Sequence, residues 1–570
     1  MTEPGPRYVA ATPVRRGLDW LAGTPYGLVV LALVVGAGAG VGAIAFRYLI
    51  LGFTRLFTGY ADYSGQGGRV PYGGHLSLGP WFVIVVPVVG GLLYGPLIYR
   101  FAREARGHGV PEVMYAVARG GGRIRPQVAI VKSLASALCI GSGGSVGREG
   151  PIVQIGSALG STLGQVIRLP ESRLRILVAC GAAGGISATF NAPIAGTFFG
   201  LEMILRDFEA ESFGVVVLSS LVADIIGRAA FGSSPFLHLP SFQIQSGWEY
   251  PLYALLGLLA ALAGVAFIRV LYGSEDVADR LWQGPEWLRP AAGGLLLGLL
   301  LYALPELYGV GYPPLEHAIR GGYAVGFLLL LLGGKMLATS LTIAIGGSGG
   351  VFAPSLFMGA MLGAAFGHVA ADLLPFGIAP AGAYGLVGMG AVFGAAARAP
   401  ITAVIIIFEL TGDYRIILPL MLAIALATGV SRLLSADTIY TLKLRRRGIE
   451  PTAHRAPNPM RILRVRDAMQ EVPDSLSPEV PLLEVIDAIG RRAGDGLPVV
   501  DADGVYRGTV GPVEVEEAMR DDAVELVARD LARETPPVHP DMSLEQALTL
   551  LLRARSNLPI INKTKNTIIK

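Results

Sequence analysis

The chain contains 570 residues, with 46 basic and 43 acidic side chains and a formal net charge of +3. This charge is too close to zero to indicate a nucleic-acid partner. Hydrophobic residues make up 52% of the sequence and charged residues only 16%, against roughly 25% charged residues in soluble proteins. These values exclude an ordinary soluble domain and a disordered chain. The composition therefore predicts a polytopic membrane protein.

The first apolar run covers residues 26–44 and follows three arginines, Arg7, Arg15 and Arg16. It is too long for the core of a signal peptide, so we interpret it as a retained membrane helix. Positive charge before the first helix favours a cytoplasmic location for residues 1–25.

The later apolar segments are separated by Gly/Pro clusters rather than by long polar loops. Several are shorter than the roughly 20 residues that a helix needs to cross a bilayer. Short, interrupted segments are typical of transporters whose half-helices end near the middle of the membrane. The segments lie at about 81–98, 128–140, 152–166, 175–188, 193–205, 214–230, 251–271, 291–303, 323–345, 352–372, 382–396, 399–410 and 415–430.

Two pairs of segments indicate an internal repeat. GGSVGREGP (143–151) aligns without gaps on GGSGGVFAP (346–354), and NAPIAGTFFGLEM (191–203) aligns on RAPITAVIIIFEL (398–410). In the second pair a glutamate stands nine residues after each proline. Two matches in the same order predict a duplicated, inverted membrane unit. The glutamates are Glu202 and Glu409, and the predicted repeats span about residues 81–230 and 291–430.

The composition becomes more polar after the last apolar segment. Residues 447–462 contain prolines and read as a linker. Residues 463–570 predict a small α/β domain, in which residues 501–504 form a turn between two short strands. Residues 497–511 and 556–570 look like two copies of one α/β unit, the second of them truncated.

The glycine-rich motifs suit the binding of an anion inside a membrane. GREGP (147–151) begins a helix with a proline in its first turn, where no intrahelical acceptor is lost. Helix N-termini carry roughly half a positive charge and stabilise anions. GVFAP (350–354) and GHGVP (107–111) offer two more such N-termini. Three weakly positive helix ends predict an anion path, because conduction requires binding that is also easily reversed.

Other interpretations of these motifs remain open. Glycine-rich helix starts also occur as plain packing devices. An intramembrane serine hydrolase is a rival from another class, because residues 143–147 and 346–350 both fit G-x-S-x-G. A hydrolase needs one nucleophile with a histidine partner, and none of the seven histidines stands in an obvious triad context. The sequence contains no G-x-x-x-x-G-K-[ST] motif of a nucleotide-driven pump.

Four segments together resemble the anion-site segments of the CLC chloride channels and transporters, in the order found in that family. They are GHGVP (107–111), GREGP (147–151), GVFAP (350–354) and SADTIY (435–440). The resemblance covers about residues 26–446. It implies an all-α inverted-repeat membrane domain with broken, re-entrant helices, a homodimer with one pore per subunit, and a location in the cell (inner) membrane with both termini cytoplasmic. It implies neither an enzyme nor a cofactor or metal; chloride is the transported ligand.

The resemblance also assigns roles to individual residues. Glu149 is the expected gate, because a carboxylate at a helix N-terminus is a tethered anion that protonation releases. The alternative is a glutamate that complements the helix dipole or pairs with Arg148, which itself suits a structural role. The expected anion-binding residues are Gly107, His108, Gly109, Gly147, Arg148, Gly150, Gly350, Val351, Phe352 and Tyr440.

Two residues depart from the pattern of the family. His108 stands where the family usually has serine, so both anion preference and pH response come into question; a histidine that points away is the alternative. Met203 stands where coupled antiporters usually carry the inner proton-relay glutamate. A thioether carries no proton, and the neighbouring Glu202 is expected to be structural.

The C-terminal region resembles the CBS-domain pair of many family members. Its ribose-binding step is degraded, and only Glu514 remains as a possible nucleotide ligand. Nucleotide binding is therefore not expected.

The sequence predicts chloride permeation through a CLC pore gated by Glu149, either channel-like or weakly coupled to protons. The alternative is an H+/Cl- antiporter with a non-standard inner proton route, and a fluoride exporter is a third possibility.

Overall fold

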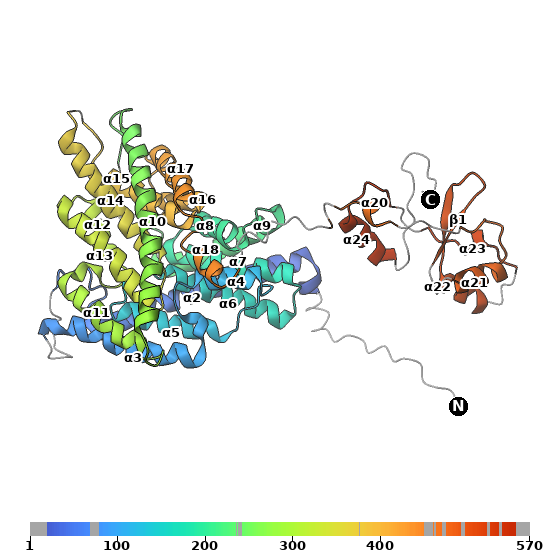
Figure 1. The fold of residues 1–570 in the computed structure, drawn as a ribbon, viewed down its shortest axis with the longest axis horizontal. Coiled ribbons are helices and arrows are strands. Elements are labelled where there is room, and N and C mark those ends of the chain that lie inside the picture. Colours follow the sequence, from blue (N-terminus) through green and yellow to red (C-terminus); the bar gives the residue numbers. More distant parts are fainter. Residues whose placement is uncertain are drawn as a thin grey trace. The chain divides into compact units, whose positions relative to one another are not determined.

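The structure is a computed structural model that describes residues 20–68, 79–234, 236–237, 242–375, 377–449, 460, 463–469, 475–491, 496–520, 525–534 and 538–554. The chain divides into two units, Met1–Pro451 and Thr452–Lys570 (Figure 1). The division falls inside the segment that the sequence indicates as a linker. The described part of the first unit is helical, and the second contains helices and one hairpin.

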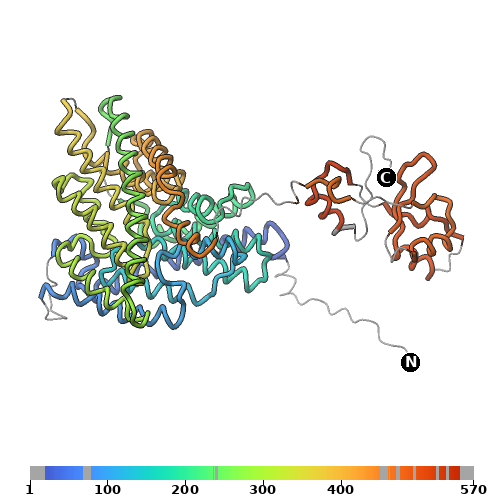
Figure 2. The backbone as a smooth tube through the Cα atoms, in the orientation of Figure 1, coloured from blue at the N-terminus to red at the C-terminus, as the bar shows by residue number. Residues whose placement is uncertain are grey.

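The first unit consists of two successive series of helices. Figure 2 shows the first series in blue to cyan and the second in green to orange. The first series comprises α2 (Pro25–Thr58), α3 (Phe82–Phe101), α4 (Val110–Ala118), α5 (Gln127–Gly141), α6 (Glu149–Ile167), α7 (Glu171–Phe190), α8 (Pro193–Phe198), the π-helix η3 (Phe199–Leu205) and α9 (Ala210–Phe231). The second comprises α10 (Glu249–Leu281), α11 (Arg289–Ala303), α12 (Tyr312–Ile319), α13 (Val325–Ala344), α14 (Phe352–Leu373), α15 (Ala381–Ala397), α16 (Pro400–Thr411) and α17 (Ile417–Leu434), and α18 (Thr441–Arg446) follows it.

The two series match element by element, which is the inverted repeat that the sequence predicts. The long helices α2 and α10, of 34 and 33 residues, begin them. The repeated unit is therefore wider than the predicted ranges, which begin only at α3 and α11. The α2 and α10 sequences share no motif, so their equivalence shows only in the order of the elements. Short 3-10 turns also recur at η1 (Gly79–Trp81), η2 (Arg103–Ala105) and η4 (Pro305–Leu307).

Glycines allow the central helices of each repeat to touch along their backbones. A Cβ atom added to Gly156 of α6 would lie 2.0 Å from the carbonyl oxygen of Gly181 of α7. In the second repeat, a Cβ on Gly359 of α14 would lie 2.2 Å from the carbonyl oxygen of Gly388 of α15. Small residues at helix contacts are typical of membrane proteins, where close packing replaces the hydrophobic effect. Much of the glycine content is thus explained by helix packing.

Eight of the described helices are long and apolar enough to cross a membrane. Others, including α8 and α16, are too short, as expected for broken helices. The predicted segment 193–205 is not one α-helix, because its second half, η3, is π-helical. A π-helical turn changes the direction of the side chains, so an α-helical projection is the wrong guide to the orientation of Glu202 and Met203.

The two glutamates of the repeat cap each other's helix. Glu202, in η3, accepts hydrogen bonds from the backbone N–H of Ile401 and Thr402 at the start of α16, at 3.3 and 2.8 Å. Glu409, in α16, accepts from the N–H groups of Ile194 and Ala195 at the start of α8, at 3.0 and 2.6 Å. Each carboxylate therefore satisfies orphan donors and complements the dipole of the opposite half-helix. This reciprocal arrangement gives the matched glutamates a structural explanation.

The second unit contains α20 (Val465–Ala468), α21 (Leu482–Gly490), β1 (Leu497–Val500), β2 (Tyr506–Val510), α22 (Pro512–Arg520), α23 (Ala528–Leu531) and α24 (Leu544–Ala554). The strands β1 and β2 form an antiparallel hairpin around the predicted turn. The Asp501 carboxylate accepts from the N–H groups of Val505 and Asp503 and from the Arg507 side chain, and these bonds, that of Val505 above all, lower the pKa of Asp501. The predicted second copy, 556–570, lies outside the described residues.

We predict that loss of either capping glutamate destabilises the membrane unit. Glu202→Ala and Glu409→Ala each leave two backbone N–H groups without an acceptor, at a cost of about 1–3 kcal/mol. The thermal unfolding midpoint in detergent should fall in both variants and by similar amounts. Glu211→Ala is a matched control, because Glu211 is an exposed acidic residue in the first turn of α9. Unchanged midpoints in both capping variants would contradict this assignment.

Candidate functional site

Three glycine-rich turns meet at one place in the membrane unit. Gly147 and Gly350 exchange two backbone hydrogen bonds, of 2.7 and 2.6 Å. The N–H of Gly107 donates to the carbonyl of Gly347 at 2.9 Å, and the N–H of Gly349 donates to the carbonyl of Gly107 at 3.3 Å. The turns that precede α4, α6 and α14 are therefore in direct contact. The three N-termini that the sequence singles out begin around one point.

Only glycine permits this contact at its closest points. A Cβ on Gly150 would lie 2.0 Å from the carbonyl oxygen of His108. A Cβ on Gly109, whose φ is +83°, would lie 2.7 Å from the carbonyl oxygen of Gly150. Both distances are far below van der Waals contact, so any side chain would push the turns apart. The glycines thus bring together helix ends that each favour negative charge.

The Glu149 side chain occupies the space between these helix ends. It is 1% exposed. One carboxylate oxygen accepts a 2.8 Å hydrogen bond from the hydroxyl of Tyr312, and the other accepts a 3.3 Å bond from the backbone N–H of Ala353 in the first turn of α14. The carboxylate that begins α6 therefore lies at the N-terminus of another helix, in the other repeat. This is the geometry of a tethered anion.

Arg148 does not pair with Glu149, so the ion pair considered as an alternative is absent between these two described residues. Its guanidinium instead lies over the rings of Phe236, Tyr312 and Phe190, at 4.9, 5.3 and 5.7 Å from the centroids. Such cation–π contacts stabilise the charge without using its N–H donors.

Tyr312 is a site residue that the sequence analysis missed. It belongs to the segment GVGYP (309–313), which occupies the same place before α12 as GHGVP (107–111) does before α4. Aligning the two segments places Tyr312 opposite Val110 and Val310 opposite His108. The internal repeat could have revealed this segment from the sequence, because the glycines and the proline of GVGYP have the same spacing as those of GHGVP.

Two buried lysines support these paired turns and were also missed. Lys132 of α5 donates to the carbonyls of Ala105 and Gly107, at 2.9 and 2.8 Å. Lys335 of α13 donates to the carbonyl of Gly309 at 2.9 Å. Each lysine stands eleven residues before the first glycine of its repeat motif, at position 143 or 346. The same device therefore holds the turn before α4 and the turn before α12.

His108 lies inside the site rather than pointing out to solvent. It is 1% exposed, and neither ring nitrogen has a hydrogen-bond partner within the described residues. Its ring makes an edge contact with Tyr272, with centroids 6.1 Å apart. Lys132 and Lys443 act on it electrostatically. A buried ring with two unused nitrogens in a positive surrounding calls for a polar ligand.

Tyr440 is brought to the site by the chain that follows α17. The preceding residue, Ile439, is held by two hydrogen bonds. Its carbonyl accepts from the Tyr272 hydroxyl at 2.6 Å, and the N–H of Ile439 donates to the carbonyl of Ala396 at 2.9 Å. Tyr440 itself is 2% exposed and within electrostatic reach of Glu149.

Val351 and Phe352 stand where α14 begins. Val351 is the N-cap residue of α14, and Phe352 packs against Phe393 with ring centroids 4.4 Å apart. The structure thus brings all the predicted motif residues into one neighbourhood.

Two other predicted positions belong to other elements. Met203 is buried, 4% exposed, in the π-helix η3. Glu514 in the second unit accepts from the N–H of Gly511 at 3.0 Å and pairs with Arg533 at 3.3 Å. Both carboxylate oxygens of Glu514 are therefore engaged within its own unit. Among the described residues, no cluster of His, Cys, Asp or Glu is suited to a metal ion.

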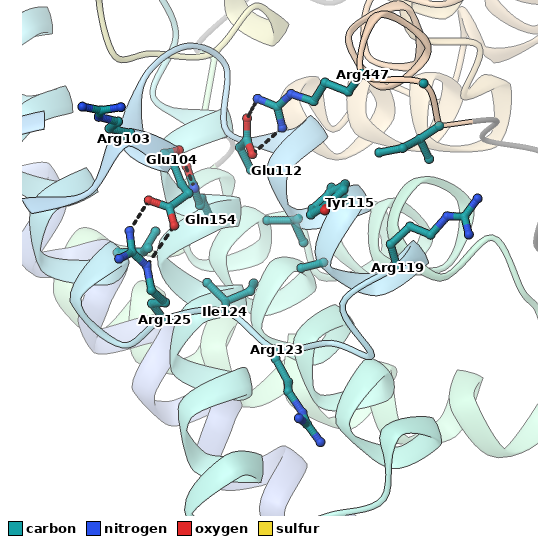
Figure 3. A pocket seen from close by; sticks show the side chains of 15 residues that line it. Arg103, Glu104, Glu112, Tyr115, Arg119, Arg123, Ile124, Arg125, Gln154 and Arg447 are labelled. Carbon is teal, nitrogen blue, oxygen red and sulfur yellow. Dashed lines mark hydrogen bonds and ion pairs between the residues drawn. The ribbon is translucent and has the colours of Figure 1, made fainter. Parts of the chain in front are cut away.

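A cavity of about 670 Å³ is lined in part by side chains of α4, among them Glu112 and Tyr115 (Figure 3). Its two acidic side chains are already paired, because Glu112 makes a bidentate contact with Arg447 and Glu104 one with Arg125. The cavity contains none of the glycine-motif residues. Its Glu112–Arg447 pair joins the end of α18 to α4, which stabilises the turn that carries His108.

These features define a polytopic membrane protein in which three helix N-termini converge beside a buried carboxylate. The chain matches the family described as voltage gated chloride channel over residues 90–432. This protein therefore belongs to the CLC family of chloride channels and transporters.

Relatives and solved structures extend this match. A putative chloride channel protein, ClcB-like, of Ralstonia nicotianae is 37% identical to this chain. The alignment covers 64% of this chain and 86% of the relative. The H(+)/Cl(-) exchange transporter ClcA of Vibrio parahaemolyticus is 34% identical, and the alignment covers 74% of this chain and 90% of that relative. The structure of a slow cyanobacterial Cl-/H+ antiporter superposes with a TM-score of 0.64 at 27% identity, over 74% of this chain and 97% of that one.

We predict that Tyr312 controls the release of Glu149. Tyr312→Phe removes a donor that favours the charged carboxylate, so acid activation of halide flux should begin at higher pH, by about one pH unit. Flux from proteoliposomes measured against pH tests this. Tyr308→Phe is the matched control, because the Tyr308 hydroxyl donates to the carbonyl of Gly141 instead. A pH profile shifted equally in both variants would show that the effect is not specific to the gate.

Proposed function

We propose that this protein exchanges chloride for protons across the membrane, with Glu149 as the outer gate and proton carrier. Anion transport is the activity of the CLC family, and exchange is named for relatives such as the Vibrio ClcA protein. The observation that carries the proposal is the Glu149 carboxylate at the N-terminus of α14. A chloride ion that reaches this helix end competes with the carboxylate for the same positive potential.

The exchange follows from this competition. When Glu149 is charged, it holds the helix end and blocks the anion. When it is protonated, its attraction to the N–H groups falls, the side chain leaves and an anion takes its place. A proton therefore enters as the anion passes in the other direction. In this scheme Gly107, Gly147, Gly150, Gly350, Val351 and Tyr440 line the anion site that the three turns create.

The inner half of the proton route is not the usual one. Met203 carries no ionisable group, and Glu202 is committed to the cap of α16. We infer that protons reach Glu149 from the inside through water or through His108, whose ring nitrogens are buried and unpartnered. The channel interpretation expected from the sequence rests on Met203 alone. It remains the second candidate, since one relative is described as a putative chloride channel.

The assembly and the location are part of the same proposal. The helices α8 and α16 are too short to span a bilayer of about 30 Å, yet their residues Ile194 and Ile401 are 50% and 41% exposed. A helix shorter than the hydrocarbon layer is accommodated, among other ways, by oligomerisation. We propose a homodimer in the cell (inner) membrane, with both termini cytoplasmic and no nucleotide bound by the second unit.

Glu149→Gln is expected to keep halide flux and to abolish coupled proton movement, because it removes the charge that carries the proton. In vesicles clamped at zero potential, a chloride gradient should drive uphill proton movement with the native chain and none with the variant. Glu171→Gln, on an exposed first-turn acid of α7, is the control. Native chloride flux without any uphill proton movement would favour the channel instead.

His108→Ser is expected to change the order of anion preference, because a small hydroxyl donor replaces a larger ring beside the anion. Flux ratios among chloride, bromide and nitrate measure this effect. His317→Ser is the control, since His317 lies at the end of α12. An unchanged preference in His108→Ser would place the ring outside the anion path.

A further inference from the structure

A separate cavity of about 210 Å³ lies beside the gate and is lined in part by Tyr312 and the turn before it. Its lining includes Arg47, Asp62, Arg148, Phe236 and Tyr312. Tyr312 contacts both this cavity and the Glu149 carboxylate, at 2.8 Å. The cavity therefore adjoins the gate through Tyr312 and through Arg148, the residue before Glu149.

The position of the cavity along the membrane follows from α2. Arg47 lies 22 residues after Pro25, where α2 begins, or about 33 Å along an α-helix at 1.5 Å per residue. This distance is comparable with the thickness of the hydrocarbon layer. With the N-terminus cytoplasmic, Arg47 and the cavity lie on the outer side.

The Arg148 side chain points to a missing ligand in this cavity. Arg148 is 8% exposed, yet its Nε and Nη2 atoms have no hydrogen-bond partner in the described part of the chain. The surrounding rings stabilise its charge but accept none of these donors in the plane of the guanidinium. Buried donors without partners are rare and require an explanation. An anion in the cavity satisfies them.

Arg47 adds a second positive charge to the lining of the cavity. Its guanidinium lies 4.1 Å from the ring centroid of Phe231, and it is close enough to Arg148 for the two to repel each other. Neither arginine forms an ion pair with another described residue. The Asp62 carboxylate also lines the cavity and acts on Arg148 electrostatically, and its Oδ1 atom accepts from the N–H and the hydroxyl of Ser64, at 2.9 and 2.6 Å. Two arginines against one carboxylate leave the lining with a net positive charge, which favours a bound anion.

We propose that this cavity is an outer binding site for a small monovalent anion such as chloride, held by Arg47 and Arg148 before it reaches the gate. The proposal rests on the anion transport proposed above and assigns it an entry site. A volume of 210 Å³ admits the anion with several waters, at about 30 Å³ each. A site of this charge raises the local anion concentration next to Glu149. An anion waiting there replaces the carboxylate as soon as it leaves.

Arg47 is the residue to change, because it is only partly buried and lies outside the glycine motifs. Arg47→Gln is expected to raise the half-saturating external chloride concentration three- to tenfold, while the ratio of protons to anions stays the same. Initial flux is measured at varied external chloride and constant ionic strength, with an impermeant anion as replacement. Arg47→Lys retains the charge and is expected to restore most of the affinity. Arg55→Gln is the matched control, since Arg55 is exposed in the last turn of the same helix.

Bromide provides a readout that does not depend on transport. Anomalous diffraction from crystals soaked in bromide should show a peak between Arg47 and Arg148, and Arg47→Gln should remove it. A cavity without bromide, or an unchanged half-saturating concentration in Arg47→Gln, would overturn the proposal. Bromide in the cavity of a protein in which Glu149→Gln leaves proton coupling intact would uphold this site and reject the proposed gate.

Discussion

The exchange of two backbone hydrogen bonds between Gly147 and Gly350 is the contact on which the site depends. It joins the first repeat to the second at the point where α6 and α14 begin. Backbone groups bonded to each other need no side chain and no water, so they satisfy a membrane interior in which unpaired polar groups cost several kcal/mol. Because the two turns are held this close, a side chain that starts α6 reaches the N-terminus of α14. The tethered carboxylate is a consequence of that contact.

Duplication supplies the frame of the site, and divergence between the copies supplies its chemistry. The motif Gly-Arg-Glu-Gly-Pro in one repeat corresponds to Gly-Val-Phe-Ala-Pro in the other, so Arg148 and Glu149 stand opposite Val351 and Phe352. The turns before α4 and α12 differ in where they carry a polar side chain. The first copy has His108, and the second has Tyr312 at another position of the motif. One repeat thus provides the charged gate, and the other provides both of its donors, Tyr312 and Ala353. Neither copy alone could form the site.

Motifs with distinctive spacing predicted the main elements, whereas contacts between distant segments were largely beyond sequence reasoning. The glycine and proline positions indicated the helix starts at Glu149 and Phe352, since these residues act through local backbone geometry. Tyr312 was missed because a tyrosine in an apolar segment is ordinary, and its role depends on a partner 163 residues away. The π-helical turn at Phe199–Leu205 was missed because it departs from the regular 3.6-residue period. The mutual caps of Glu202 and Glu409 depend on the symmetry of the folded repeats.

The way Glu149 is held bears on how readily it exchanges with an anion. Its carboxylate is bound by two neutral donors, a hydroxyl and a backbone N–H, rather than by the guanidinium next to it in the chain. Neutral donors lack the attraction between two full charges that an ion pair with a guanidinium adds. An ion pair with Arg148 would hold the gate shut more firmly than a halide could compete with. Arg148 instead lies over the rings of Phe236, Phe190 and Tyr312. In the proposed exchange, this leaves the carboxylate displaceable while the charge of Arg148 still attracts anions to the same place. In this arrangement Arg148 attracts the anion and Glu149 closes the site, and the two side chains are not paired. This suits a site that must bind an anion and then release it.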